Sequence, residues 1–276
     1  MGYLTEVNIL VTGSNGQLGT CIKDEVNNGN SKNIWHFADR SIVDITDIES
    51  IRKFVIDNNI KVIVNCAAYT NVDKAEEDYD TALEINYGGV CKLTSVCREF
   101  DIYLIHISTD YVFGKEAYNV PCREEQQGTP TGVYGISKLH GEQRIKEVGC
   151  DYVIIRTAWL YGDGKNFVKT MLRLSETNDK VRVVCDQYGS PTSAIELAKA
   201  IAYLLPTDNY GLFHGTCEGS TNWADFTKEI FRLAGKNTLV EAISSEEYSA
   251  NASATVAPRP SYSILENYML KLTTNH

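Results

Sequence analysis

The sequence predicts an α/β fold, with a doubly wound parallel sheet and a smaller C-terminal α/β lobe. Two observations predict it: short apolar runs alternate with helix-length segments as far as Arg156, and the first apolar run passes directly into a glycine-rich turn. Such alternation is typical of βαβ units. Beyond Trp159 the alternation loosens. We therefore assign residues 1–165 to the sheet domain and expect the chain to return to it at about 186–214. Residues 166–185 and 215–276 are assigned to the lobe.

The turn after the first apolar run holds Gly13, Gly16 and Gly19. In a strand–turn–helix corner the first permits a tight turn, the second lets the backbone approach a phosphate, and the third lets helix and strand pack closely. A helix starting at Gln17 would add its N-terminal dipole. The spacing is G-x-x-G-x-x-G rather than G-x-G-x-x-G. The turn alone therefore does not decide between dinucleotide binding and an ordinary strand–turn–helix corner.

A second strand is expected at 34–38 and ends at Asp39-Arg40. Asp39 could bind the adenine ribose hydroxyls, whereas Arg40 could meet a 2′-phosphate, so NAD and NADP both stay open. Asp44 is a candidate for the adenine edge. Asp47 or Thr46 is expected to cap a helix over 48–57.

The third strand, 61–65, leads into Cys66-Ala67-Ala68-Tyr69. Small residues there would let a flat ligand reach the sheet edge, although close helix packing explains them nearly as well. A long helix over 79–99, a strand over 102–107, a helix over 132–148 and a strand over 152–156 should follow. For the remainder we expect helices at 167–175, 194–204 and 223–233, strands at 181–185 and 212–214, and a loop at 251–260.

Composition excludes several classes of protein. The 276 residues carry a net charge of -10, which argues against gripping nucleic acid or an anionic membrane through bulk charge. The sequence contains neither an apolar stretch of membrane-spanning length nor a signal-peptide pattern, so we expect a cytoplasmic protein. The eight cysteines are scattered, which predicts buried thiols rather than disulfides, zinc or another metal site.

Tyr134 and Lys138 lie four residues apart and should share one helix face. A nearby ammonium would lower the pKa of the phenol, making Tyr134 a usable proton donor, while the lysine could also hold a cofactor ribose. Thr109, at the end of a strand, could orient the substrate oxygen. Such a pair arises by chance in many helices, but here it follows the glycine turn, Asp39-Arg40 and the small residues in order.

These ordered motifs resemble those of the extended short-chain dehydrogenase/reductases, from about Val7 to Leu272. Within that group the chain is most similar to dTDP-4-dehydrorhamnose reductases. The local matches are the turn 13–19, Asp44 to Asp47, Asn65 to Tyr69 with Val72 to Glu76, Ser108 to Phe113, Tyr134 to Lys138 with Gly141-Glu142, Arg156 to Gly162, Asn166-Phe167, Asp186 to Thr192, and Arg259-Pro260 with Ser263 and Leu265.

The resemblance implies a Rossmann-type domain and an NADPH- or NADH-dependent reduction of the 4-keto group of a nucleotide-linked 6-deoxysugar, such as dTDP-4-dehydro-L-rhamnose. Tyr134 would donate the proton, Lys138 would bias it electrostatically and Thr109 would bind the reacting oxygen. The expected cofactor contacts are Gly13, Asn15, Gly16, Gln17, Leu18, Gly19, Asp39, Arg40, Asp44, Ile45, Ala67, Ala68, Tyr69, Tyr134 and Lys138. The sugar nucleotide would contact Asp110, Tyr111, Trp159, Asn166, Gln187 and Arg259.

Several alternatives stay open. Trp159 could serve core packing, and Arg259 could be a surface cation. A dehydratase on this fold would need a second carboxylate after Asp110, where this chain has Tyr111, so reduction is favoured over dehydration. Another nucleotide-sugar reductase or epimerase, and a non-catalytic subunit that binds dinucleotide for stability, are the other options. The oligomeric state is undetermined, with a homodimer as one option.

Overall fold

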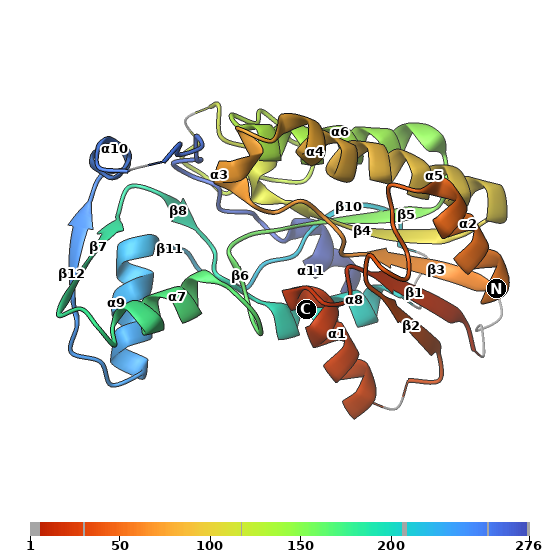
Figure 1. Ribbon diagram of the computed structural model, residues 1–276, viewed down its shortest axis with the longest axis horizontal. Helices are drawn as coiled ribbons and strands as arrows, with labels where there is room; N and C mark the ends of the chain where they lie inside the picture. Colours follow the sequence, from red (N-terminus) through yellow and green to blue (C-terminus); the bar gives the residue numbers. More distant parts are fainter. Residues whose placement is uncertain (1–5, 30, 117, 206–208, 253, 275–276) are drawn as a thin grey trace.

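A six-stranded parallel sheet forms the centre of the molecule in the computed structural model, which describes residues 6–29, 31–116, 118–205, 209–252 and 254–274. The strand order is β2-β1-β3-β4-β5-β10, and Figure 1 shows the sheet between two helical layers. The strands are β1 (Asn8–Thr12), β2 (Ile34–Ala38), β3 (Ile60–Asn65), β4 (Tyr103–Thr109), β5 (Tyr152–Thr157) and β10 (Gly211–His214). The predicted doubly wound fold is confirmed.

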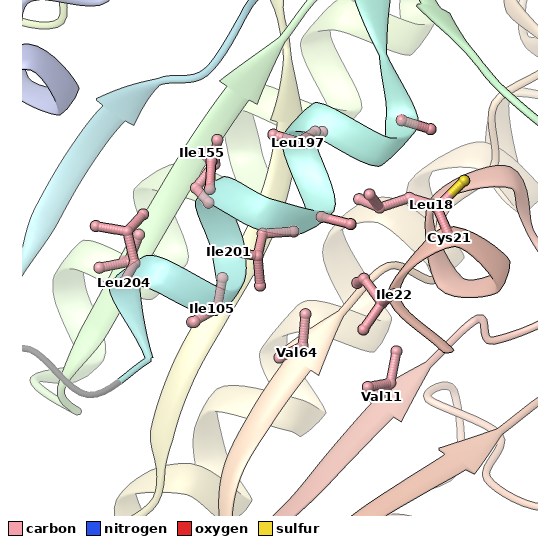
Figure 2. Packing of buried hydrophobic residues seen from close by; sticks show 14 of the residues in the cluster. Val11, Leu18, Cys21, Ile22, Val64, Ile105, Ile155, Leu197, Ile201 and Leu204 are labelled. Carbon is pink, nitrogen blue, oxygen red and sulfur yellow. The ribbon is translucent and has the colours of Figure 1, made fainter. Parts of the chain in front are cut away.

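Helices cover both faces of this sheet because the strands are apolar on both sides. One face packs against α1 (Gln17–Asn28), α8 (Ala194–Leu204) and α11 (Tyr268–Thr274), and the other against α2 (Ile48–Asp57), α5 (Gly89–Phe100) and α6 (Val133–Val148). Figure 2 shows Leu197 and Ile201 of α8 and Leu18 and Ile22 of α1 packed over the same side of the strands. Asp47 caps α2 by accepting a hydrogen bond from the Glu49 backbone amide at 3.0 Å.

The long helix expected over 79–99 is interrupted. It consists of α4 (Tyr79–Leu83), a π-helical turn (Glu84–Gly88) and α5. Asn86 in that turn is buried, where it accepts a hydrogen bond from the Tyr69 backbone amide at 2.9 Å and donates to Ser137 Oγ at 3.0 Å. The wider turn therefore brings a polar side chain into a helix face that a regular pattern would make apolar.

The C-terminal lobe lies to one side of the sheet (Figure 1). Its parallel pair β7 (Lys180–Val184) and β12 (Leu239–Ile243) packs against α7 (Phe167–Leu174) and α9 (Trp223–Leu233), with α10 (Ser245–Ala250) after β12. Sequence analysis did not predict β12, α10, α11 or the short α3 (Val72–Ala75). The two-residue strands are β6 (Leu160–Tyr161), β8 (Tyr188–Gly189), β9 (Thr192–Ser193) and β11 (Thr221–Asn222).

The end of the described chain returns to the sheet. Leu265 forms a bridge with Cys122, and Leu270 of α11 is buried in the core beside β10. The domain bounds proposed from the sequence stay a prediction, but this segment of 215–276 packs with the sheet and not with the lobe. Alternation of polar and apolar residues carries no information about which core a short terminal helix joins.

Gly13 is expected to tolerate no side chain. Its φ is +63°, and an added Cβ would lie 2.6 Å from the Ala67 backbone nitrogen. We expect Gly13→Ala to lower the free energy of unfolding by about 2–5 kcal/mol, through left-handed strain plus overpacking. At Gly149, with φ +74°, an added Cβ would meet no described atom within 4 Å apart from its chain neighbours, so Gly149→Ala should cost only about 1–2 kcal/mol. Equal losses for the two variants in urea unfolding would contradict the close contact.

Candidate active site

A cleft of about 760 Å³ opens at the carboxyl ends of the sheet strands. Its lining comes from the segments that follow β1, β2, β3, β4 and β5, together with α6. In an open parallel sheet these ends face the same crevice, beside the point where strand order reverses. Here that point lies between β1 and β3, whose neighbours run to opposite sides. The glycine turn of residues 13–19 borders it.

The glycine turn fits an anionic group. Gly16, the N-cap residue of α1, donates a backbone hydrogen bond to the Gly13 carbonyl at 3.0 Å, and no described side chain caps the first turn of the helix. The free amides at that end therefore suit a phosphate. Among the described residues, Gln17 also holds a buried Oε1 atom with no hydrogen-bond partner. Leu18 and Gly19 continue the lining.

The residues after β2 form a charged rim on the cleft. Asn15 donates from Nδ2 to Asp39 Oδ2 at 2.8 Å, and Arg40 pairs with Asp44 at 3.1 Å. Hydrogen bonds from Ser41 lower the pKa of Asp39. Asp44 also accepts bonds from the Thr46 amide and hydroxyl, which holds the turn before α2. These predicted cofactor contacts therefore lie close together. The Arg40 side chain is 75% exposed, so it can leave Asp44 to bind a phosphate of a ligand.

The small residues after β3 occupy the middle of the cleft. Ala67 and Ala68 line it beside Ile45, whereas Tyr69 turns its hydroxyl to Asp78 at 3.3 Å. The Tyr69 side chain therefore lies apart from the cofactor contacts predicted around it.

Thr109, Tyr134 and Lys138, the predicted catalytic set, lie together on the cleft wall. The Thr109 hydroxyl donates to Asp110 Oδ1 at 3.2 Å, and Thr109 is close enough to Tyr134 to lower the pKa of the phenol. Asp110 Oδ2 accepts a hydrogen bond from Ser263 Oγ at 2.5 Å, and burial raises the pKa of this aspartate to about 6. A chain of hydrogen bonds therefore fixes Thr109 and Asp110 next to Tyr134.

The expectation that Lys138 lowers the pKa of Tyr134 is wrong for this structure. Burial, opposed by Thr109 and assisted by Asp110, raises the pKa of Tyr134 to about 12. Lys138 instead donates to the Ile107 carbonyl at 2.6 Å, and its own pKa falls to about 8 because of burial. Desolvation dominates the pKa of both groups. The phenol consequently stays protonated at neutral pH, which suits a proton donor.

A second cavity of about 620 Å³ lies between the cleft wall and the lobe, and Tyr111 lines both. It contains three of the predicted substrate residues, Tyr111, Gln187 and Arg259. Arg259 pairs with Asp73 at 2.8 Å and donates to the Ala257 carbonyl at 3.3 Å. Gln187 donates to Ser245 Oγ at 2.9 Å and accepts from Trp223 Nε1 at 3.2 Å.

The other two predicted substrate residues, Trp159 and Asn166, differ in their surroundings. Trp159 lines the first cleft and also packs against Trp223, with ring centroids 3.4 Å apart. Asn166 instead caps α7, accepting from the Lys169 amide at 3.0 Å and donating to the Gly162 carbonyl at 2.7 Å. The structure does not bring Asn166 into the lining of either cavity.

Sequence reasoning missed a buried ion pair beneath the site. Arg156 of β5 forms a two-pronged contact with Glu142 of α6, at 2.9 and 2.7 Å. Ser108 donates to the same carboxylate at 2.6 Å, which ties the pair to the residue before Thr109. Arg182, Trp223 and Ser245 in the second cavity were missed as well. A search for charged residues inside apolar strands could have found Arg156.

Within the described residues, no helix has the length and apolar character required to cross a bilayer. Nor do they contain a group of three or more His, Cys, Asp or Glu side chains arranged to bind a metal ion. The eight cysteines are free thiols.

The fold and the cleft define an NAD(P)H-dependent oxidoreductase of the extended short-chain dehydrogenase/reductase class. The family model described as the RmlD substrate binding domain matches residues 7–276, and the chain belongs to this family.

Three relatives illustrate the similarity. A solved structure from Clostridium acetobutylicum, called a dTDP-4-dehydrorhamnose reductase, is 44% identical with a TM-score of 0.91, covering 97% of this chain and 92% of its own. Another from Bacillus anthracis, in complex with NADP, is 38% identical with a TM-score of 0.90 and the same coverage. A dTDP-4-keto-6-deoxy-D-glucose reductase from Streptomyces niveus is 40% identical over 82% of this chain and 78% of its own.

Proposed function

We propose that this protein reduces the 4-keto group of a dTDP-linked 6-deoxysugar, with dTDP-4-dehydro-L-rhamnose as substrate and dTDP-L-rhamnose as product. The observation that carries the proposal is that Thr109, Tyr134 and Lys138 line the same cleft as the glycine turn of residues 13–19. The names of the related proteins from Clostridium and Bacillus support the choice of sugar.

The chemistry requires one hydride and one proton. The nicotinamide, when bound, supplies the hydride to sugar C4. Tyr134 transfers its phenolic proton to the carbonyl oxygen, so that the C=O bond becomes a secondary alcohol. Thr109 and Asp110 lie next to the phenol, and the raised pKa of Tyr134 keeps the proton in place until the oxygen gains negative charge. At pH 7, where Lys138 is mostly charged, its ammonium would compensate the phenolate that forms.

The residue after Asp110 supports reduction rather than elimination. Tyr111 occupies the place where a dehydratase of this fold would need a second carboxylate. Its ring packs edge-on against Tyr134, with centroids 5.5 Å apart, and burial raises the pKa of its phenol well above the ordinary value. Elimination of water would need a further general base, and a phenol that stays protonated at neutral pH does not provide one.

The second cavity is the proposed place of the nucleotide. It contains Trp223 and Phe167, flat rings on which a base can stack, together with Arg182 and Arg259, whose charges suit a diphosphate. Because Tyr111 lines both cavities, a sugar beside Tyr111 would connect a nucleotide in one cavity with a nicotinamide in the other.

We further propose NADPH as the preferred cofactor, with Arg40 binding the 2′-phosphate. Arg40→Ala should raise the KM for NADPH about tenfold or more, because a charge-assisted contact is lost, and leave the KM for NADH nearly unchanged. Lys53→Ala is the matched control, since Lys53 is an exposed cation on α2 paired with Asp57. If Arg40→Ala changed both cofactors equally, Arg40 would not read the 2′-phosphate.

The substrate assignment is tested by offering 4-keto-6-deoxysugars linked to dTDP, UDP and GDP, with NADPH and NADH, and following the loss of nicotinamide absorbance. We expect turnover with dTDP-4-dehydro-L-rhamnose and NADPH. Preferential turnover of dTDP-4-keto-6-deoxy-D-glucose would instead assign the activity named for the Streptomyces relative. Tight dinucleotide binding without turnover of any sugar would point to a non-catalytic subunit.

A further inference from the structure

A chain of four buried polar side chains runs beneath the cleft. Thr12, Asn65 and His106 come from β1, β3 and β4, and Lys138 comes from α6. Each is at most 2% exposed. His106 lies below the cleft wall, so it can act on bound molecules only through a neighbour. That neighbour is Lys138, whose Nζ lies 3.3 Å from His106 Nε2.

Asn65 determines which nitrogen of His106 carries the proton. Asn65 Oδ1 accepts from Thr12 Oγ1 at 2.6 Å and from the Ala67 backbone amide at 3.2 Å. Because a backbone N–H can only donate, the amide oxygen of Asn65 must face it, and Asn65 Nδ2 must face His106 Nδ1 at 3.0 Å. Nδ1 is therefore an acceptor, and a neutral imidazole then carries its hydrogen on Nε2.

His106 is neutral in this environment. Burial, reinforced by the charge of Lys138, lowers the pKa of His106 well below its ordinary value. Its Nε2–H group consequently points toward Lys138 Nζ. An ammonium has no lone pair and would meet this donor unfavourably, whereas a neutral amine accepts the hydrogen bond while still donating to the Ile107 carbonyl at 2.6 Å.

We propose that His106 is a positioning residue that, through the tautomer imposed by Asn65, holds Lys138 and stabilises its neutral amine. The relevance to catalysis rests on the proposed function, in which Lys138 serves Tyr134. The other groups that face the amine are Glu142 on its own helix and Cys66 after β3, both of which raise the pKa of Lys138. Burial opposes them, and the pKa of Lys138 lies at about 8.

The consequence is a lysine that changes protonation state close to neutral pH. At pH 7 an amine with this pKa is mostly charged, and above pH 8 it is mostly neutral. His106 shifts this balance toward the neutral form at every pH, because its donor contact exists only with the amine. Removing the donor should therefore raise the pKa of Lys138.

Two isosteric variants separate this role from simple packing. A glutamine at position 106 places an amide N–H where Nε2 lies, and an asparagine places its polar group where Nδ1 lies. The pKa of Lys138 is measured by NMR titration of protein carrying ¹³C at lysine Cε, with the Lys138 signal identified by its loss in Lys138→Arg. We expect His106→Asn to raise this pKa by about one unit, the effect of one hydrogen bond to an ionisable group, and His106→Gln to leave it nearly unchanged.

A second measurement uses the unaltered protein. The chain has five histidines, and the signals of His106 in ¹⁵N-histidine-labelled protein are those that disappear in His106→Gln. We expect the Nε2–H tautomer without titration between pH 6 and 9. An Nδ1–H tautomer, a titration near the ordinary histidine pKa, or equal Lys138 titrations in the two variants would overturn the proposal. Neither measurement uses a substrate, so a failure of the proposed reductase activity remains a separate result.

Discussion

Tyr134→Phe is expected to lower kcat by about 10²–10⁴-fold, the usual contribution of a positioned general acid. The variant removes one oxygen atom and keeps the ring, which packs against Tyr111. Tyr134 lines the cleft together with Thr109, and its hydroxyl is the proposed proton donor. Cofactor binding and the urea midpoint should change little, because the phenylalanine fills the same space. The measurement is kcat for a dTDP-linked 4-keto sugar, together with cofactor affinity by fluorescence.

Tyr118→Phe provides the matched control. Tyr118 also lies in a partly buried cluster and its hydroxyl bonds to Thr129 at 2.9 Å, but it packs with Phe113 away from the cleft. The Tyr118→Phe variant should keep the kcat of the unaltered protein. Comparable kcat values for Tyr134→Phe and Tyr118→Phe would show that the proton comes from another group, water included.

Glu142→Gln should lower the free energy of unfolding by about 3–5 kcal/mol, because it leaves the charge of Arg156 buried without a partner. Both side chains are at most 2% exposed, and glutamine preserves the volume of glutamate. In the described structure Arg156 already has one buried nitrogen, Nη1, without a hydrogen-bond partner. The measurement is equilibrium unfolding in urea. The loss of Glu142 should also loosen Ser108, next to Thr109, and so reduce kcat.

The control for this prediction is Glu229→Gln, which breaks a surface pair with Arg232 whose side chains are 50% and 67% exposed. That change should cost at most about 1 kcal/mol, since water screens exposed pairs. Replacing both buried partners, in Glu142→Leu with Arg156→Met, should recover much of the stability. A loss as small as that of Glu229→Gln would mean that Arg156 finds solvent or another anion.

Prediction from sequence worked best where local chemistry decides the structure. The apolar run of β1, the cap of α2 at Asp47 and the bounds of α8 and α9 follow from patterns within a few residues. The same holds for the glycine turn, because its geometry needs only Gly13, Gly16 and Gly19. Prediction from sequence was less successful in the lobe, where β12 is a partly exposed strand that becomes regular only by pairing with β7.

The candidate site divides in the same way. Thr109, Tyr134 and Lys138 could be named from residue type and order, because each follows a predictable strand or shares one helix face. Their protonation could not be predicted. The raised pKa of Tyr134 and the lowered pKa of Lys138 depend on burial, which arises from segments far apart in the chain. Asn166 was named from the sequence as a substrate contact, whereas in the structure its side chain caps α7.

The sequence by itself determined the doubly wound fold and named the proposed phosphate-binding turn and the proposed proton donor, because these depend on local backbone preferences and on which groups can carry protons. Only the tertiary structure decided how those groups are charged and held. It placed Ser263 behind Asp110, Asn65 behind His106 and Glu142 against Arg156. Desolvation and hydrogen-bond direction are properties of a packed interior, and no single segment of the chain contains them.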